Sequence, residues 1–252
     1  MMGEMDGTPT LVLLHGFTNT GASWEPVVQA FAGQYRPLAP DIRGQGIASS
    51  AEPVTLAAVI ADIAALTQHS ERFTLVGYSM GGRIALHAAL ALRERVERLV
   101  LIGASPGLAD ADARAARRAA DERLADELQT LSIDEFARRW AQTPVLAGVS
   151  GEVAARAHAD RLRSTPAGLA RSLRGLGTGA LPSLWERLGE LTLPVTLVTG
   201  ERDRKFTAIA VEMAALLPDA EQVVVPGVGH AVHLEAPQAV AAIIDTSQSV
   251  LR

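Results

Sequence analysis

Short apolar runs alternate with longer amphipathic stretches along most of this 252-residue chain. Apolar runs bounded by turn residues favour buried strands, and the amphipathic stretches between them favour helices. We expect strands at residues 10–14, 36–40, 73–77, 96–103, 195–200 and 222–225, and helices at 23–31, 55–69, 83–92, 206–217 and 236–251. This alternation predicts an α/β fold, with a mostly parallel sheet that carries helices on both faces.

The alternation stops between residues 105 and 182, a segment rich in Ala and Arg that predicts helices and no strand. We therefore expect an α/β core formed by residues 1–104 and 183–252, with residues 105–182 inserted as a helical cap, or lid. A cap at this place covers the carboxyl ends of the strands, where open α/β sheets bind their ligands.

Charge and composition exclude several classes of partner. The formal net charge is −5 and the chain has no cysteine, which excludes disulfides, thiolate metal sites and thiol nucleophiles. A net negative charge argues against nucleic acid and anionic membranes. No apolar run reaches the ~18 residues of a membrane span, and residues 1–10 lack the pattern of a signal peptide. A cytoplasmic monomer or homodimer is expected.

The segment Gly77-Tyr78-Ser79-Met80-Gly81 places a serine directly after a predicted strand and just before a predicted helix. It has the G-x-S-x-G pattern of a nucleophile elbow, in which small neighbours allow a tight turn that exposes the serine hydroxyl. The helix that follows points its first N–H groups toward any anion formed nearby. An ordinary glycine-rich turn is the alternative, and the strand-to-helix context favours Ser79 as a nucleophile.

An acid and a histidine follow in the chain order that such an elbow requires. Asp203 comes just after the predicted strand 195–200, and His230 comes just after the predicted strand 222–225. Both therefore lie at the same edge of the sheet as Ser79, where a carboxylate can orient the histidine that exchanges a proton with the serine. Glu201 is a rival acid that comes too early, and His233 is a rival base more typical of a helix start.

Two backbone amides are candidates for an oxyanion hole. The loop after the first strand, His15-Gly16-Phe17, offers the N–H of Phe17, and the residue after the nucleophile offers the N–H of Met80. His15 itself is expected to be structural. The glycine-rich turn at residues 41–46 is also expected to be structural.

These motifs together resemble the α/β-hydrolase family over nearly the whole chain. The resemblance implies the fold and the triad, but not the reaction, because the family includes esterases, lactonases, C–C bond hydrolases, lyases and receptors. At position 45 this chain has glutamine, where histidine is common in the family. We expect the difference to affect only the packing of the loop that contains Gln45.

Arginine is placed where it would favour an anionic substrate. Arg83 lies four residues after Ser79, so both fall on one face of the predicted helix, and a guanidinium there can bind a carboxylate in bidentate fashion. The cap has 11 arginines and 10 acidic residues, whereas the rest of the chain has 12 basic and 18 acidic residues. Lys205, the only lysine, follows Asp203 by two residues and can add a charge at the rim.

Four segments, residues 77–83, 138–144, 175–179 and 200–206, resemble one lyase family within these hydrolases, whose members act in menaquinone biosynthesis. That resemblance implies elimination of pyruvate from an enolpyruvyl cyclohexene carboxylate carrying a succinyl group, with no metal and no organic cofactor. It implies a polycarboxylate substrate bound by residues matched in those segments or in the cap, namely Tyr78, Arg83, Trp140, Arg117 and Arg163.

Two alternatives remain open from the sequence. A cofactor-free carboxylesterase or C–C bond hydrolase would use the same Ser79, Asp203 and His230 but has no need of Arg83 and the cap arginines. A non-catalytic ligand receptor on the same fold has no need of the three residues together. Turnover of aryl acetate esters distinguishes the first alternative, and tight binding without turnover distinguishes the second.

Overall fold

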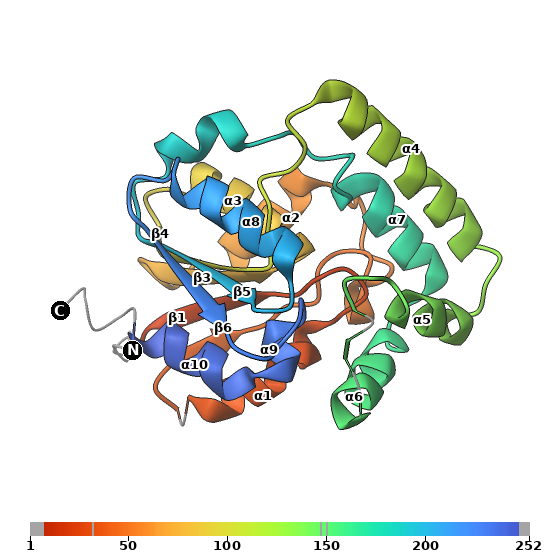
Figure 1. Cartoon of the computed structure of the whole chain (residues 1–252), viewed down its shortest axis with the longest axis horizontal. Helices are drawn as coiled ribbons and strands as arrows, with labels where there is room; N and C mark the ends of the chain where they lie inside the picture. The colour runs from red at the N-terminus through yellow and green to blue at the C-terminus, as the bar shows by residue number, and fades with distance from the viewer. Residues whose placement is uncertain (1–7, 32, 147, 150, 247–252) are drawn as a thin grey trace.

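The computed structural model describes residues 8–31, 33–146, 148–149 and 151–246, and within them one parallel sheet runs through the molecule (Figure 1). Its strand order is β2-β1-β3-β4-β5-β6, and every neighbouring pair is parallel. The strands are β1 (Thr10–Leu14), β2 (Arg36–Leu38), β3 (Phe73–Tyr78), β4 (Val96–Ile102), β5 (Val195–Gly200) and β6 (Ala220–Val225). The expected α/β fold with a parallel sheet is confirmed.

The four central strands are rich in apolar residues and almost entirely buried, because helices cover both of their faces. Every residue of β1, β3 and β5 is buried, and so is β4 apart from Glu97, whereas the edge strands β2 and β6 are partly exposed. One core cluster fills the space under α2 (Leu56–Leu66), α3 (Met80–Ala91) and α8 (Arg204–Ala214). A second cluster lies under α1 (Glu25–Ala30) and α10 (Pro237–Thr246) on the opposite face.

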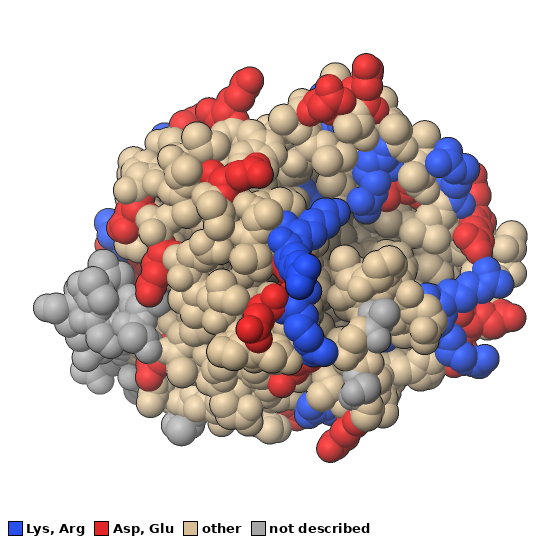
Figure 2. All heavy atoms as spheres, in the orientation of Figure 1, with Lys and Arg blue, Asp and Glu red and all other residues tan. Residues whose placement is uncertain are grey.

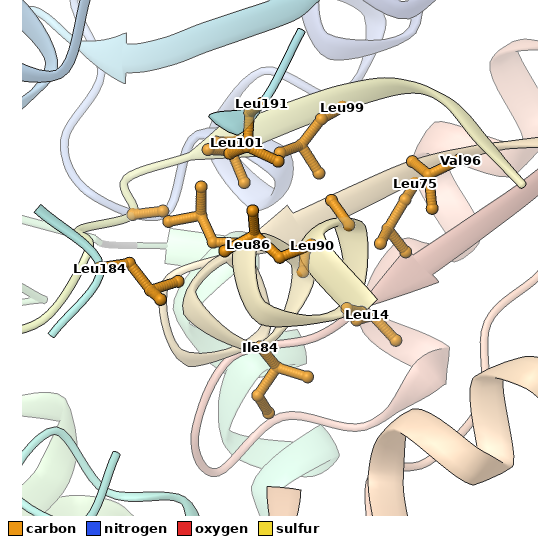
Figure 3. Packing of buried hydrophobic residues seen from close by; sticks show 14 of the residues in the cluster. Leu14, Leu75, Ile84, Leu86, Leu90, Val96, Leu99, Leu101, Leu184 and Leu191 are labelled. Atoms are coloured by element: carbon orange, nitrogen blue, oxygen red, sulfur yellow. The ribbon is translucent and has the colours of Figure 1, made fainter. Parts of the chain in front are cut away.

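Helix α3, which begins at the predicted elbow, is buried against the sheet (Figure 3). Leu86 and Leu90 lie one turn apart on this helix and pack in the same cluster as Leu75 and Leu99 of the neighbouring strands. Burying a leucine side chain of this kind contributes about 1.5–3 kcal/mol. This packing fixes the first turn of α3 relative to the ends of β3 and β4.

Four helices and no strand occupy the described part of residues 105–182, between β4 and β5, and Figure 1 shows them together on one side of the sheet. They are α4 (Ala111–Leu128), α5 (Ile133–Ala141), α6 (Gly151–Arg161) and α7 (Pro166–Leu176). Their first turns are capped by side chains in three cases, by Asp110, Ser132 and Thr165. α4, α5 and α7 share a small core of their own. The division into core and cap stays a prediction.

Some element ends differ from those expected. β2 stops at Leu38, because Pro40 has no N–H to donate to a neighbouring strand. The chain from residue 232 forms a short α9 (Val232–Glu235) and then α10, which starts at Pro237. The expected last-helix residues 247–251 lie outside the described residues, as do residues 1–7 at the start of the chain. No helix of the described part is long and apolar enough to cross a membrane.

Candidate active site

Ser79 lies in a strained turn between β3 and α3. Its φ of 52° and ψ of −110° are outside the regions that a serine ordinarily adopts. The turn closes only because its neighbours lack side chains: a Cβ on Gly81 would lie 2.3 Å from the carbonyl oxygen of Leu14, and one on Gly77 would lie 2.5 Å from that of Gly81. The glycines of the G-x-S-x-G motif are therefore dictated by backbone contacts.

The structure brings Ser79, His230 and Asp203 together. His230 Nδ1 lies 2.6 Å from Asp203 Oδ2, and His230 Nε2 lies 3.1 Å from Ser79 Oγ. A carboxylate can only accept, so Nδ1 carries the proton and Nε2 is free to accept from the serine hydroxyl. His230 and Asp203 are 5% and 8% exposed, which keeps the pair away from bulk water. The geometry is that of a proton-transfer relay ending at Ser79.

Contacts around the histidine and the acid hold them in place. The second oxygen of Asp203 accepts from Phe206 N–H at 3.3 Å and so caps α8. The Phe206 ring lies 4.5 Å from the His230 ring between centroids, and Lys205 Nζ lies 5.5 Å from the centre of Phe206. Glu235 accepts from Gly229 N–H at 3.0 Å, which fixes the residue before His230. Lys205 is exposed and sits at the outer side of this group.

The structure does not bring the two rival residues into the relay. Glu201 is exposed, and its carboxylate accepts from Gly227 N–H at 2.8 Å. His233 is fully buried, and among the described residues neither of its ring nitrogens has a hydrogen-bond partner. Its ring lies 4.2 Å from that of Tyr78, between centroids. Burial, followed by the nearby His230 and His15, lowers the pKa of His233 to about 3.

The two predicted oxyanion donors are the N–H groups of Phe17, in the loop after β1, and of Met80, directly after Ser79. Met80 is the first residue of α3, where N–H groups have no partner within the helix. No hydrogen bond of the described part uses the N–H of Phe17. His15 is structural, as expected: its Nε2 accepts from Ile42 N–H at 2.9 Å, and its Nδ1 lies 2.9 Å from the carbonyl oxygen of Gly16. Two donors are thus available to an oxyanion.

Aromatic rings line the cap side of this loop. The Trp140 ring on α5 meets the Phe17 ring edge-on at 5.1 Å between centroids and stacks on Phe136 at 5.7 Å. Tyr78, directly before the serine, is buried, and its ring lies 5.3 Å from that of His230. Burial raises the pKa of the Tyr78 hydroxyl, so this side chain stays protonated. Of the residues predicted to contact the substrate, Tyr78 thus lies beside His230 and Trp140 lies beside Phe17.

Arg83 lies buried one turn beyond Ser79 and is 7% exposed. Its Nε has no hydrogen-bond partner, and no ion pair of its guanidinium occurs in the described part of the chain. The pKa of Arg83 is lowered to about 10, by burial first and by the nearby charge of Arg117 second, while Asp121 acts in the opposite direction. Arg117 on α4 donates to Asp121 at 2.7 Å, so much of its own charge is already paired.

Arg161 is a further candidate site residue that was not predicted from the sequence. It ends α6, is 5% exposed, and donates from Nε to Thr18 Oγ1 at 3.4 Å. Burial lowers its pKa, and Tyr78 and Asp160 act in the opposite direction, which places Arg161 near the residue that precedes Ser79. Arg163, selected from the sequence, is exposed in the turn beyond the helix. Ala157 and Arg161 are one turn apart on the buried face of α6, and residue 163 is not on that face.

The surface is hollowed beside the helices of residues 105–182. Figure 2 shows this hollow between the sheet on one side and the cap helices on the other, with basic side chains along its edge. Within the described residues no group of three or more His, Asp or Glu side chains could hold a metal ion. The arrangement offers a nucleophile or base, two oxyanion donors and buried cations.

The chain belongs to the α/β-hydrolase family, whose model, described as "Alpha/beta hydrolase family", matches residues 11–243. Within it, the chain groups with a set of synthases. It is 37% identical to the 2-succinyl-6-hydroxy-2,4-cyclohexadiene-1-carboxylate synthase of Salmonella newport (strain SL254), over 100% of this chain and 97% of the relative.

Solved structures agree with this grouping. A structure of MenH from S. aureus superposes with a TM-score of 0.90 at 29% identity, covering 96% of this chain and 93% of that one. A thermophilic esterase from Thermogutta terrifontis superposes with a TM-score of 0.80 at 24% identity, covering 96% and 89%. The second likeness shows the fold alone, so the fold is shared by proteins with different activities.

Proposed function

We propose that this chain is a lyase that eliminates pyruvate from 2-succinyl-5-enolpyruvyl-6-hydroxy-3-cyclohexene-1-carboxylate and releases 2-succinyl-6-hydroxy-2,4-cyclohexadiene-1-carboxylate in menaquinone biosynthesis. The names of its relatives support the product. The observation that carries the proposal is the pair of buried arginines, Arg83 and Arg161, beside the group of Ser79, His230 and Asp203. Such cations suit a substrate with several carboxylates.

Binding of the substrate would satisfy these arginines. A buried guanidinium without an acidic partner is costly, and a carboxylate that accepts two hydrogen bonds from it offsets that cost. Arg83 extends from the nucleophile helix and Arg161 from the cap, so they hold the substrate from two sides. Tyr78 and Trp140 supply the apolar surface for the ring, and Lys205 adds charge at the rim.

Proton removal begins with the relay. His230 Nε2 takes the proton of Ser79, and Asp203 stabilises the resulting imidazolium through Nδ1–H. The Ser79 oxygen then removes the ring proton on the carbon that carries the succinyl ketone, so no acyl-enzyme forms. The amides of Phe17 and Met80 donate to the ketone oxygen as negative charge develops on it.

The electrons then move through the ring. The pair from the broken C–H bond forms the first new double bond, the existing double bond shifts by one position, and the C–O bond to the enolpyruvyl group breaks. The leaving enolate takes up one proton and becomes pyruvate. Atoms and charge balance without a redox partner, and the absence of a cofactor stays a prediction.

Release of pyruvate tests the proposal. The purified chain is given the enolpyruvyl substrate, and pyruvate is followed through NADH oxidation by lactate dehydrogenase. The wild type should release pyruvate, and Ser79→Ala should lose about 10³-fold or more in rate, as relay residues generally do. Full pyruvate release by Ser79→Ala would contradict the proposed proton transfer.

A carboxylesterase is the second candidate, because a serine, a relay and two oxyanion donors are also what acyl transfer needs. Aryl acetate esters distinguish the two functions. Fast ester turnover without pyruvate release would favour the hydrolase, and tight substrate binding without any turnover would favour a receptor. A cytoplasmic location, a monomer or homodimer, and the absence of nucleic-acid and membrane partners stay predictions.

A further inference from the structure

Gln45 is a fully buried side chain in the turn after β2 whose carboxamide joins two parts of the site. Its Oε1 accepts from Thr18 N–H at 2.7 Å. Its Nε2 donates to Ser172 Oγ, on cap helix α7, at 3.3 Å. Its backbone is fixed as well, because Gln45 N–H donates to the carbonyl of Ile42 at 2.9 Å. A side chain in this setting has little freedom to move.

The bond to Thr18 acts on the peptide beside Phe17. Thr18 has a φ of 72° and is 1% exposed, a conformation that a β-branched residue adopts only when its surroundings impose it. On the other side of Phe17, the carbonyl of Gly16 accepts from Asn19 N–H at 3.2 Å. Both peptide planes that flank Phe17 are therefore held, the second of them by Gln45.

The bond to Ser172 connects Gln45 to the side chain of Met80, the residue whose N–H is the other proposed donor. Ser172 is fully buried, and its hydroxyl lies 3.9 Å from the sulfur of Met80, to which it donates. Gln45 thus contacts the loop of Phe17 directly and the side chain of Met80 through one residue of the cap. One proposed donor lies in the loop after β1 and the other at the start of α3. Because Gln45 contacts that loop and, through Ser172, the Met80 side chain, it restrains the position of one relative to the other.

We propose that Gln45 is a positioning residue: it holds the Phe17–Thr18 peptide, and through it orients the Phe17 N–H of the preceding peptide toward an oxyanion, and it ties this loop to cap helix α7. This inference rests on the proposed function, because it assigns the two amides to the reacting oxygen. Gln45 does not touch the substrate. Its effect therefore appears in the rate of the chemical step more than in substrate binding.

The main variant is Gln45→Leu, which keeps the size of the side chain and removes both hydrogen bonds. Losing one oxyanion donor costs about 10²–10³ in kcat, so misplacing one is expected to lower kcat about 10- to 100-fold. KM should change by less than about threefold, since the carboxylate-binding arginines are untouched. Gln45→His should recover most of the rate, because a neutral imidazole also offers one acceptor and one donor.

Thr67→Val is the matched control. Thr67 is equally buried and hydrogen-bonded, to the carbonyl of Ile63 at 2.8 Å, but it lies at the end of α2, away from the site. Amide hydrogen exchange of residues 16–19, measured by mass spectrometry, gives a second readout. It should quicken in Gln45→Leu and stay unchanged in Thr67→Val.

The outcomes separate the two proposals. A kcat loss confined to Gln45→Leu, with faster exchange at residues 16–19, supports the positioning role. An unchanged kcat, a loss that appears in KM instead, or an equal loss in Thr67→Val overturns it. If the wild type releases no pyruvate, the proposed function fails, and exchange at residues 16–19 alone then decides whether Gln45 holds the loop.

Discussion

His233 gives a prediction about acid stability. Its ring is fully buried against Tyr78 and Trp24, at 4.2 and 4.7 Å between centroids. Its pKa is lowered to about 3 by burial first and by His230 and His15 second, whereas the ordinary value is 6.5. The unfolded chain therefore binds a proton at this residue in a pH range where the folded chain does not.

The sign and size follow from that difference. Because the pKa of His233 is lowered in the folded chain, its contribution to the free energy of unfolding is fully present above pH 6.5. That contribution is lost progressively as the pH falls from 6.5 toward 3, where only the unfolded chain binds the proton. Each pH unit in that window costs about 1.4 kcal/mol, so going from pH 7 to pH 5 removes about 2 kcal/mol through His233 alone. His87, whose pKa is lowered to about 4 by burial and by Arg83, acts in the same direction.

Comparison with His233→Phe isolates this contribution. Phenylalanine keeps a ring between Tyr78 and Trp24 and cannot take up a proton. Urea unfolding at pH 7 and pH 5 should show the wild type losing about 2 kcal/mol more than the variant between these two values. Equal losses in both proteins would refute the assignment, because His87 and His15 are present in each.

Three further predictions follow from contacts in the site. In the pyruvate assay, Arg161→Gln should raise KM for the enolpyruvyl substrate about 10-fold or more, because a buried guanidinium that binds a carboxylate is lost. The same change at exposed Arg163 should leave KM within about twofold. Asp160→Ala should lower the free energy of unfolding, measured in urea, by about 1–3 kcal/mol. The reason is that the buried N–H of Thr20, which donates to Asp160 at 3.0 Å, would be left without an acceptor. Gly81→Ala should lower it by about 3 kcal/mol or more, since its Cβ would meet the Leu14 carbonyl oxygen at 2.3 Å; a fully stable, active variant would contradict the account of the elbow.

The strands and the elbow could be predicted from the sequence because local rules determine them. Apolar runs identify buried strands, and the glycines around Ser79 are required by backbone contacts within one strand-turn-helix unit. Asp203 and His230 could be placed because parallel strands all end at one edge of the sheet. The roles of these residues in the reaction stay predictions.

The cap residues could not be placed in the same way. Arg161 and Arg163 differ only by two positions, and the choice depends on the register of α6 against the loop after β1. That register is set by Asp160, which accepts from Asn19 Nδ2 at 3.2 Å across 141 residues of sequence. The partners of Gln45, Thr18 and Ser172, lie 27 and 127 residues away in sequence. Long-range polar contacts of this kind leave no periodic signal.

The loop after β1 touches three cap helices, through Trp140 on α5, Asp160 on α6 and, by way of Gln45, Ser172 on α7. This has a consequence for protein engineering. A cap grafted from another member of the family would bring its own substrate pocket, but it would leave Thr20 and Gln45 without their partners. A successful chimera must therefore exchange residues 15–20 and Gln45 together with the cap, so substrate range and catalytic geometry are inherited as one module.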